Sequence, residues 1–294
     1  MRYFLESDLL KVEIDSYGAE VKSVLHKKNY REYMWYGNGQ VWGRTSPILF
    51  PFIGSLRDKK YTHKGVAYEM TSHGFARDME FSLVEQKGNE IWFSIESTEA
   101  TLVNYPFVFR LELGYRLEGD VLTVLWRVKN NGEDTMYFSI GAHPAFLCPL
   151  AGEADKSGYQ INFGELDEVH HHGSILGKGL ALHEDIVIPL ENHRVTLTKE
   201  FFDRCTYFIE HKQTGFVSLE TPEGKPVVTM NFDAPLFALW SPEGKNAPFF
   251  CIEPWYGRCD WEDYEGELKD RDYTNVLAAG KEFEASYTIQ YHQV

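Results

Sequence analysis

Cysteine is scarce in this sequence, and its arrangement excludes two common uses of the residue. The 294 residues include four cysteines, none of which belongs to a CxxC pair: Cys148, Cys205, Cys251 and Cys259. A disulfide scaffold needs a denser framework, and zinc sites need closer spacing of their ligands. No EF-hand calcium loop is present either. We therefore expect reduced thiols and no bound metal.

Positive charge is also in short supply. There are 29 Lys and Arg against 44 Asp and Glu, which gives a net charge of −15. No segment concentrates the basic residues into a stripe that follows a phosphate backbone, so we expect no nucleic-acid partner. Walker loops, GxGxxG turns and GxSxG elbows are missing as well. We therefore expect no nucleotide or other cofactor and no serine nucleophile.

Long hydrophobic runs are a third absence. The chain opens with MRYFLESDLLKVEI, which carries acidic residues where a signal peptide needs an unbroken apolar stretch. No apolar run elsewhere reaches the ~20 residues of a membrane helix. We expect a cytoplasmic protein that does not contact membranes.

Helical periodicity is missing too, and alternation with a period of two takes its place. No long segment keeps an apolar stripe with a 3.6-residue period. Aromatic residues, which suit pleated strands, make up 15% of the chain. The clearest alternating runs lie at 9–14, 90–97, 121–130, 216–221 and 285–292. These features predict a chain made mainly of strands.

The chain contains no linker, low-complexity segment or clean internal repeat that would divide it. We therefore expect a single domain over residues 1–294. Roughly fifteen to twenty short strands in one unit must stack as two large sheets to bury their apolar faces. The predicted fold class is all-β, a large antiparallel β-sandwich. Short helical turns are expected near 199–204, with Thr198 as the N-cap, and near 261–268.

Three stretches differ from ordinary strand sequence because each surrounds a titratable side chain with small residues, prolines or aromatics. They are TSHGFARD at 71–78, SIGAHPAF at 139–146 and CIEPWYGRCD at 251–260. In the third stretch Glu253 follows an apolar run, and a carboxylate is rarely buried without a partner or a task. Two interpretations are open: a structural salt bridge, with Arg258 the nearest candidate, or proton abstraction.

Histidines stand in the other two stretches. His143 has small residues before it and a proline after it, and imidazole can donate a proton and recover it near neutral pH. The alternative is a core histidine bonded to a backbone carbonyl. This interpretation is weakened because a second histidine, His73, stands in a similar setting. The triplet 170–172 is different, because consecutive strand residues point to alternate faces and cannot share one metal. We expect it to form a solvated loop.

Together these motifs resemble the aldose 1-epimerase (galactose mutarotase-like) family, and within it the branch of LacX-type proteins and hexose-6-phosphate mutarotases. The resemblance spans nearly the whole chain. Its motifs, in order, are GAEVKSVL, SPILFPFIGSLRD, SHGFARD, GAHPAF, FFDRCTY, FALWSP, CIEPWYG and GKEFEASYTIQY.

The resemblance implies a β-sandwich and a role for each matching residue. His143 corresponds to the family's general acid and Glu253 to its general base. His73 corresponds to a second sugar-binding histidine, Asp203 to an aspartate that bonds sugar hydroxyls, and Arg57 to a binding arginine. The expected partner is a small sugar, and the reaction needs neither metal nor cofactor.

The implied activity is the exchange of α and β anomers of an aldohexose. Glu253 takes the proton of the anomeric hydroxyl while protonated His143 gives one to the ring oxygen, and the ring opens. Rotation about the C1–C2 bond and reclosure then yield the other anomer. Trp240 or Trp255 would offer a face on which the sugar stacks.

Three alternatives stay open. A hexose 6-phosphate needs a cationic pocket, for which Arg44, Arg57 and Arg77 are the candidates. A non-catalytic carbohydrate-binding or sensing protein would have little need for both an acid and a base. A glycosidase needs two carboxylates, so Asp203 would have to act together with Glu253.

Overall fold

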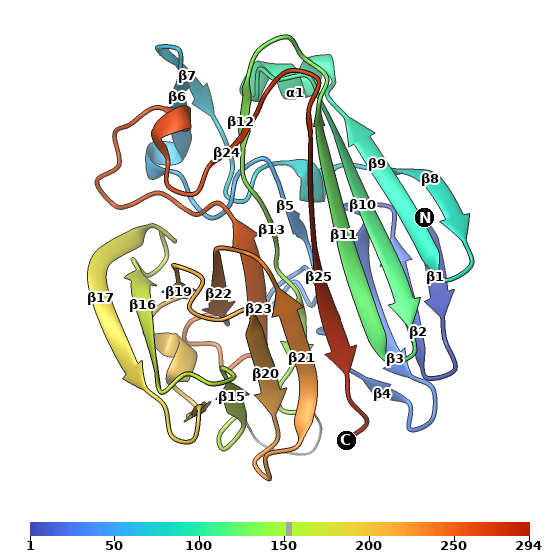
Figure 1. Cartoon of the computed structure of the whole chain (residues 1–294). Coiled ribbons are helices and arrows are strands. Elements are labelled where there is room, and N and C mark those ends of the chain that lie inside the picture. The colour runs from blue at the N-terminus through green and yellow to red at the C-terminus, as the bar shows by residue number, and fades with distance from the viewer. Residues whose placement is uncertain (151–154) are drawn as a thin grey trace.

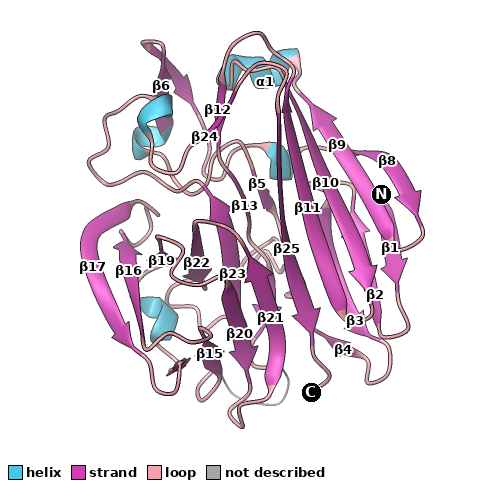
Figure 2. Ribbon diagram, in the orientation of Figure 1, coloured by secondary structure: helices cyan, strands magenta, loops and turns pink. Residues whose placement is uncertain are grey.

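Two large antiparallel sheets pack face to face in the computed structural model, which describes residues 1–150 and 155–294 (Figure 1, Figure 2). The nine-stranded sheet has the order β18-β15-β20-β21-β25-β11-β10-β9-β8. Its strands are β8 Ser82–Lys87, β9 Glu90–Glu96, β10 Phe109–Glu118, β11 Val121–Asn130, β15 Gln160–Asn162, β18 Arg194–Thr196, β20 Phe216–Glu220, β21 Pro226–Phe232 and β25 Glu282–Tyr291.

The eight-stranded sheet has the order β17-β16-β19-β22-β23-β13-β5, with β14 also paired to β23. Its strands are β5 Ile48–Leu49, β13 Ile140–Ala142, β14 Ala145–Leu147, β16 Glu168–Ser174, β17 Ala181–Pro189, β19 Tyr207–Ile209, β22 Leu236–Trp240 and β23 Phe249–Tyr256.

Smaller elements complete the fold. A four-stranded sheet and two strand pairs contain β1 Arg2–Glu6, β2 Leu10–Asp15, β3 Glu20–His26, β4 Arg31–Glu32, β6 Lys60–His63, β7 Val66–Glu69, β12 Met136–Phe138 and β24 Asn275–Leu277. The helical elements are the α-helix α1 Glu99–Asn104 and the 3-10 turns η1 Arg57–Lys59, η2 Ala76–Asp78, η3 Phe201–Asp203 and η4 Leu268–Asp270. No helix among the described residues is long and apolar enough to cross a membrane.

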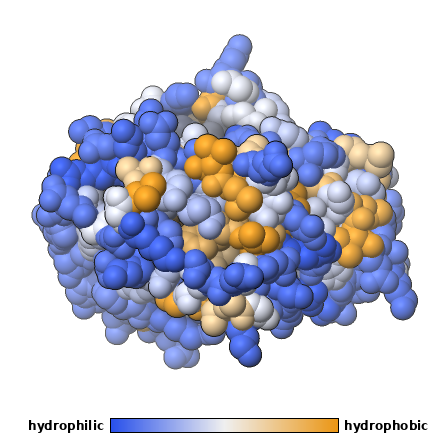
Figure 3. All heavy atoms as spheres, turned by 90° about the horizontal axis from the view of Figure 1, so that it is seen from above, coloured by the Kyte–Doolittle hydropathy of each residue, from blue (hydrophilic) through white to orange (hydrophobic). Residues whose placement is uncertain are grey.

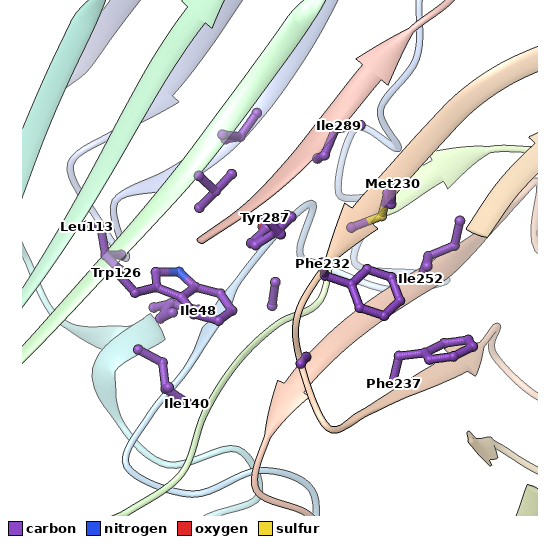
Figure 4. Close-up of a cluster of buried hydrophobic side chains, with 14 of the residues drawn as sticks. Ile48, Leu113, Trp126, Ile140, Met230, Phe232, Phe237, Ile252, Tyr287 and Ile289 are labelled. Carbon is purple, nitrogen blue, oxygen red and sulfur yellow. The ribbon is translucent and has the colours of Figure 1, made fainter. Parts of the chain in front are cut away.

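The main core lies between the two large sheets. Figure 4 shows side chains from both inner faces meeting there: Trp126 and Tyr287 come from the nine-stranded sheet, and Phe237 and Ile252 from the eight-stranded one. All four are at least 95% buried. The surface seen from above is mostly hydrophilic, with separate apolar patches (Figure 3). The predicted all-β sandwich is confirmed.

Strand alternation turns part of β23 away from that core. Ile252 faces inward into the main core, so its neighbours Cys251 and Glu253 project from the opposite face of the eight-stranded sheet. Smaller apolar clusters cover this outer face, including one around Phe208 and Trp255. The functional motifs therefore lie outside the sandwich core, on a face that turns and loops enclose.

Each of the five alternating runs corresponds to an observed strand: β2, β9, β11, β20 and β25. The helical turn expected near 199–204 is η3, but its N-cap is Glu200 and not Thr198. The turn expected near 261–268 begins only at Leu268. The triplet 170–172 was expected in a loop and instead lies in β16, because β17 and β19 pair with it on both sides.

Candidate active site

Two of the three motifs meet on neighbouring strands of the eight-stranded sheet. β13 and β23 run antiparallel with Gly141 opposite Trp255, and β14 continues the same register with Ala145 opposite Cys251, so His143 falls between these pairs at the level of Glu253. Gly141 is required for this approach, because a Cβ atom there would lie 2.7 Å from Cδ1 of Trp255. Pairing between two motifs that are far apart in sequence therefore brings the histidine to the glutamate.

His143 and Glu253 form a close, buried pair. Nε2 of His143 lies 3.4 Å from Oε1 of Glu253, and the two residues are 5% and 1% exposed. Within the described parts of the chain, neither carboxyl oxygen nor the imidazole Nδ1 makes a hydrogen bond of good geometry, although the indole N–H of Trp255 is close enough to Glu253 to lower the pKa of its carboxyl. Buried polar atoms are nearly always hydrogen-bonded, so these atoms are available to a ligand.

His73 approaches the pair from the turn that precedes η2. Its φ of 65° is rare for a residue other than glycine, and its ring centroid lies 5.4 Å from that of His143. The backbone N–H of Gly54 donates to Nδ1 of His73 over 3.1 Å. Nδ1 is therefore an acceptor and Nε2 of the neutral ring carries the proton. Burial, followed by the charge of Arg77, holds the pKa of His73 well below its usual value, so this ring is a neutral donor.

These side chains line a cavity of about 180 Å³. Drug-sized ligands occupy cavities of about 300–1,000 Å³, so this one suits a single small molecule. Its walls are Trp42, Gly54, Ser55, Ser72, His73, Arg77, His143, Gly179, Thr206, Phe208, Trp240, Glu253 and Trp255. A larger hollow of about 600 Å³ lies on the outer face of the nine-stranded sheet, but Arg116 and Arg127 there are paired with glutamates.

Burial decides where the proton shared by His143 and Glu253 lies. The pKa of Glu253 is well above its ordinary value because burial disfavours the carboxylate, and the indole of Trp255 offsets this only in part. Burial, followed by the positive charges of Arg77 and Arg44, lowers the pKa of His143 to about 3. In the protein alone the proton therefore belongs on the carboxyl. The arrangement expected from sequence, a protonated imidazole facing a carboxylate, is the other tautomer of the same pair.

Arg77 is the only cationic side chain among the described residues of the cavity wall. It donates from Nη2 to the carbonyl oxygen of Ser72 over 2.6 Å, and its buried Nε has no hydrogen-bond partner in the described structure. The adjacent Asp78 binds Arg44 over 2.7 Å and lies farther from Arg77, with 3.9 Å between its Oδ2 and Nε of Arg77. Burial and the charge of Arg44 lower the pKa of Arg77 to about 10. The cavity wall therefore carries a positive charge that nearby carboxylates compensate only weakly.

Two predicted binding residues lie outside the cavity wall. The guanidinium of Arg57 turns to the loop near residue 264 and binds Oε1 of Glu265 over 2.9 Å. The carboxylate of Asp203 accepts from the backbone N–H of Gly244 over 2.8 Å. Each holds a loop near the site, so the structure does not support the direct sugar contacts predicted from motif matching.

The salt-bridge interpretation of Glu253 is wrong. Arg258, its nearest candidate partner in sequence, is buried beneath Trp261 and binds Glu210 over 2.9 Å. Arg258 lies beyond the end of β23, past Gly257, and pairs with another carboxylate. The titratable neighbours left to the carboxyl of Glu253 are the imidazole of His143 and the thiol of Cys251.

Several wall residues were not among the site residues predicted from sequence. Trp240 and Trp255, the two predicted stacking residues, do line the cavity, but Trp42, Ser72 and Thr206 do so as well. Thr206 belongs to the stretch FFDRCTY, whose Asp203 lies outside the described wall residues. Trp42 stands in GNGQVWG, and aromatic residues between glycines are too common to mark a site by themselves.

A group of possible metal ligands overlaps the pair. One ligand atom each from His143, Cys251 and Glu253 lie within 4.8 Å of one another. A metal would have to displace protons from the thiol and the carboxyl, and burial raises the pKa of both. We therefore assign no metal to these residues, and the absence of a metal site stays a prediction.

Known proteins resemble this chain over most of its length. The family model described as Aldose 1-epimerase matches residues 1–269. Protein LacX from Lactococcus lactis subsp. lactis, in its plasmid and chromosomal forms, is 31% identical over 282 residues, which cover 93% of this chain and 94% of the relative. The structure of a galactose mutarotase related enzyme from Lactobacillus acidophilus superposes with a TM-score of 0.92 at 31% identity, covering 100% of this chain and 98% of that one. A galactose mutarotase-like protein from Lactobacillus casei gives 0.91 at 27% identity, covering 99% and 100%.

Proposed function

The chain belongs to the aldose 1-epimerase family and is an isomerase, and on that premise we propose that it interconverts the α and β anomers of an aldohexose, with His143 and Glu253 as the proton-transferring pair. The observation that carries the proposal is the distance of 3.4 Å between Nε2 of His143 and Oε1 of Glu253 in the cavity wall.

One proton shared by the pair is sufficient for the reaction. Ring opening starts from the tautomer with a carboxylate and an imidazolium. Glu253 takes the proton of the anomeric hydroxyl, His143 protonates the ring oxygen, and the C1–O5 bond breaks as the C1 carbonyl forms. The pair then has a protonated carboxyl and a neutral imidazole, the tautomer that the protein alone favours. After rotation about C1–C2, both transfers reverse and the ring closes.

The remaining wall supports binding of a sugar. The Nε2–H of His73 and the hydroxyls of Ser72 and Thr206 are neutral hydrogen-bonding groups, and Trp240 and Trp255 are apolar surfaces for the C–H faces of a pyranose. Holding the sugar between such groups aligns both proton transfers in one geometry.

The test is polarimetry on pure anomers. The parent should speed the change in optical rotation of an α-hexose above its spontaneous rate. His143→Asn and Glu253→Gln should each lower kcat by roughly 10²–10⁴-fold, while His183→Asn, at an exposed histidine, should act as the parent does. If both site variants match the parent, the proton-shuttle proposal is wrong and a non-catalytic carbohydrate-binding function takes its place.

Arg77 favours a second candidate function, the same reaction on a hexose 6-phosphate. Its weakly compensated charge in the cavity wall suits an anionic substituent. The two candidates separate when kcat/KM is compared for glucose and glucose 6-phosphate with the parent and Arg77→Met. Activity confined to the phosphorylated sugar, and lost in the variant, would make the phosphorylated substrate the correct one. Equal activity of both proteins on free glucose would support the first proposal.

A glycosidase has less support. Glu253 is the only carboxylate among the described wall residues, and Asp203, the second carboxylate that this alternative needs, lies outside them. Failure to release sugar from any aryl glycoside would agree with this conclusion.

A further inference from the structure

An indole outside the sequence motifs lies over the catalytic histidine. The ring of Trp42 stacks on the imidazole of His143 with centroids 4.8 Å apart and planes inclined by 28°. Two other rings contact the same imidazole at steep angles, Trp240 at 5.1 Å and 83° and His73 at 5.4 Å and 73°. Among these three, only Trp42 lies nearly parallel to the imidazole.

The loop that carries Trp42 sets its position independently of His143. The backbone N–H of Trp42 donates to the carbonyl oxygen of Asn38 over 2.8 Å, and the carbonyl of Trp42 accepts from Nε1 of Trp35 over 2.8 Å. The ammonium of Lys245 donates to the carbonyl of Val41 over 3.0 Å. These hydrogen bonds hold the indole in place without any contribution from His143, and the imidazole lies against the face of the indole.

The charges around His143 mostly oppose its protonation. Arg77 and Arg44 repel a proton there, and burial acts in the same direction. His73 is neutral, as is the thiol of Cys251, whose pKa burial raises. Among the groups around the imidazole, an ionised Glu253, a hydrogen bond with the backbone of His143 itself and the aromatic rings favour an imidazolium. Ring opening nevertheless begins from that imidazolium.

We propose that Trp42 is a positioning residue for the general acid, whose ring face stabilises the imidazolium of His143 and holds the imidazole plane so that Nε2 faces Glu253. The inference rests on the proposed mutarotase activity and deepens it. An aromatic face attracts a cation because the ring's quadrupole is negative there, and the attraction is largest where water is excluded. The indole thereby offsets part of the repulsion from Arg77 when the proton moves from the carboxyl to the imidazole.

Two substitutions at one position separate the ring face from simple packing. Trp42→Phe keeps an aromatic face, whereas Trp42→Leu keeps an apolar side chain without one. The leucine variant should lose about tenfold in kcat, equivalent to about 1.4 kcal/mol of activation free energy, with KM changed by less than about threefold. The phenylalanine variant should recover most of the loss. Trp92→Leu, which removes a partly exposed indole from the outer face of the nine-stranded sheet, should match the parent.

A second measurement reads the imidazole directly. In protein with ¹³C-labelled histidine, the resonance that disappears in His143→Asn reports the pKa of His143. This pKa should be lower in Trp42→Leu than in Trp42→Phe, because only the latter retains a face for the cation. Equal kcat and equal pKa in the two variants, or a rise in KM with kcat unchanged, would reduce Trp42 to a wall residue and overturn the inference. If the parent itself fails to mutarotate sugars while the pKa order holds, only the proposed function is wrong.

Discussion

At the scale of the residue, the burial that suits Glu253 to the proposed proton transfer also makes its ionised form unfavourable for folding. Its pKa is near 4.5 in the unfolded chain and is raised well above that value by burial in the folded protein. The stabilising contribution of the protonated carboxyl is therefore complete below about pH 4.5 and is lost as the pH rises through the folded pKa. At neutral pH, the carboxyl of Glu253 must therefore take up a proton when the chain folds.

Glu253→Gln should consequently make the protein more stable and less active. We expect the free energy of unfolding to rise by about 1 kcal/mol or more at pH 8, since each pKa unit corresponds to about 1.4 kcal/mol. The gain should be smaller at pH 5, and urea denaturation at the two pH values measures both. Glu118→Gln, at an exposed hairpin glutamate, is the control and should change neither quantity. An identical gain at both pH values would contradict the assigned pKa direction.

His143 titrates in the opposite sense. The pair works with one proton, and a second proton, taken up by the imidazole, prevents Glu253 from acting as a base. Because burial and Arg77 lower the pKa of His143 to about 3, the acid limb of kcat/KM should lie well below pH 6.5. The raised pKa of Glu253 places the alkaline limb above the usual range of a glutamate.

Arg77→Met removes a charge that lowers the pKa of His143, so the acid limb should move to higher pH. The pH dependence of kcat/KM on the better substrate measures the shift. Arg57→Met is the matched control, because Arg57 lies outside the cavity wall, and it should leave the limb in place. An unmoved limb in the Arg77 variant would show that this charge does not act on the imidazole.

At the scale of the element, the turn that presents His73 depends on Gly74. This glycine has a φ of 71°, and a Cβ atom there would lie 2.2 Å from the carbonyl oxygen of Phe50. Gly65 also has a positive φ, 77°, but a Cβ atom there would meet nothing within 4 Å. An alanine would have a strained backbone at either position, but only at Gly74 would its Cβ atom also clash with a neighbouring atom.

Gly74→Ala should cost more than Gly65→Ala and should also impair the site. We expect Gly65→Ala to lose about 1 kcal/mol of stability and keep full activity. Gly74→Ala should lose at least about 2 kcal/mol and reduce kcat/KM, because displacement of the turn moves the donor of His73. Denaturant unfolding and polarimetry measure the two effects. Similar behaviour of both variants would show that the turn has room to adjust.

The secondary structure predicted from sequence was wrong where strand pairing or helix capping had a larger effect than the local residue pattern. The triplet 170–172 is polar enough for a loop, yet β17 and β19 supply its backbone hydrogen bonds and bury His171 to 4% exposure. The helix α1 was missed because six residues are too few for a helical period. Its signal was the capping box formed by Thr98 and Thr101.

At the scale of the whole molecule, the two large sheets share one core, and the prediction of a single domain can be tested by perturbing that core. Ile252→Ala removes a fully buried side chain from the strand that carries Glu253. It should cost about 2–5 kcal/mol. Far-UV circular dichroism and tryptophan fluorescence should give one coincident unfolding transition. The exposed Val187→Ala should change stability by less than about 0.5 kcal/mol. Two separate transitions would instead indicate two folding units.

The sequence by itself determined the class of fold and selected His143 and Glu253 as candidates for the proposed proton transfer. Alternation with a period of two is a local property of the chain, so strands such as β11 and β25 could be predicted directly from the sequence. His143 and Glu253 could be selected because small residues, proline and aromatics surround each of them in the chain. Only the tertiary structure decided that Trp42 covers the histidine, that Arg77 and not Arg57 lines the cavity, and that the proton rests on the carboxyl. Stacking, desolvation and charge act through space between segments that strand pairing brings together, and spacing along the chain does not contain those distances.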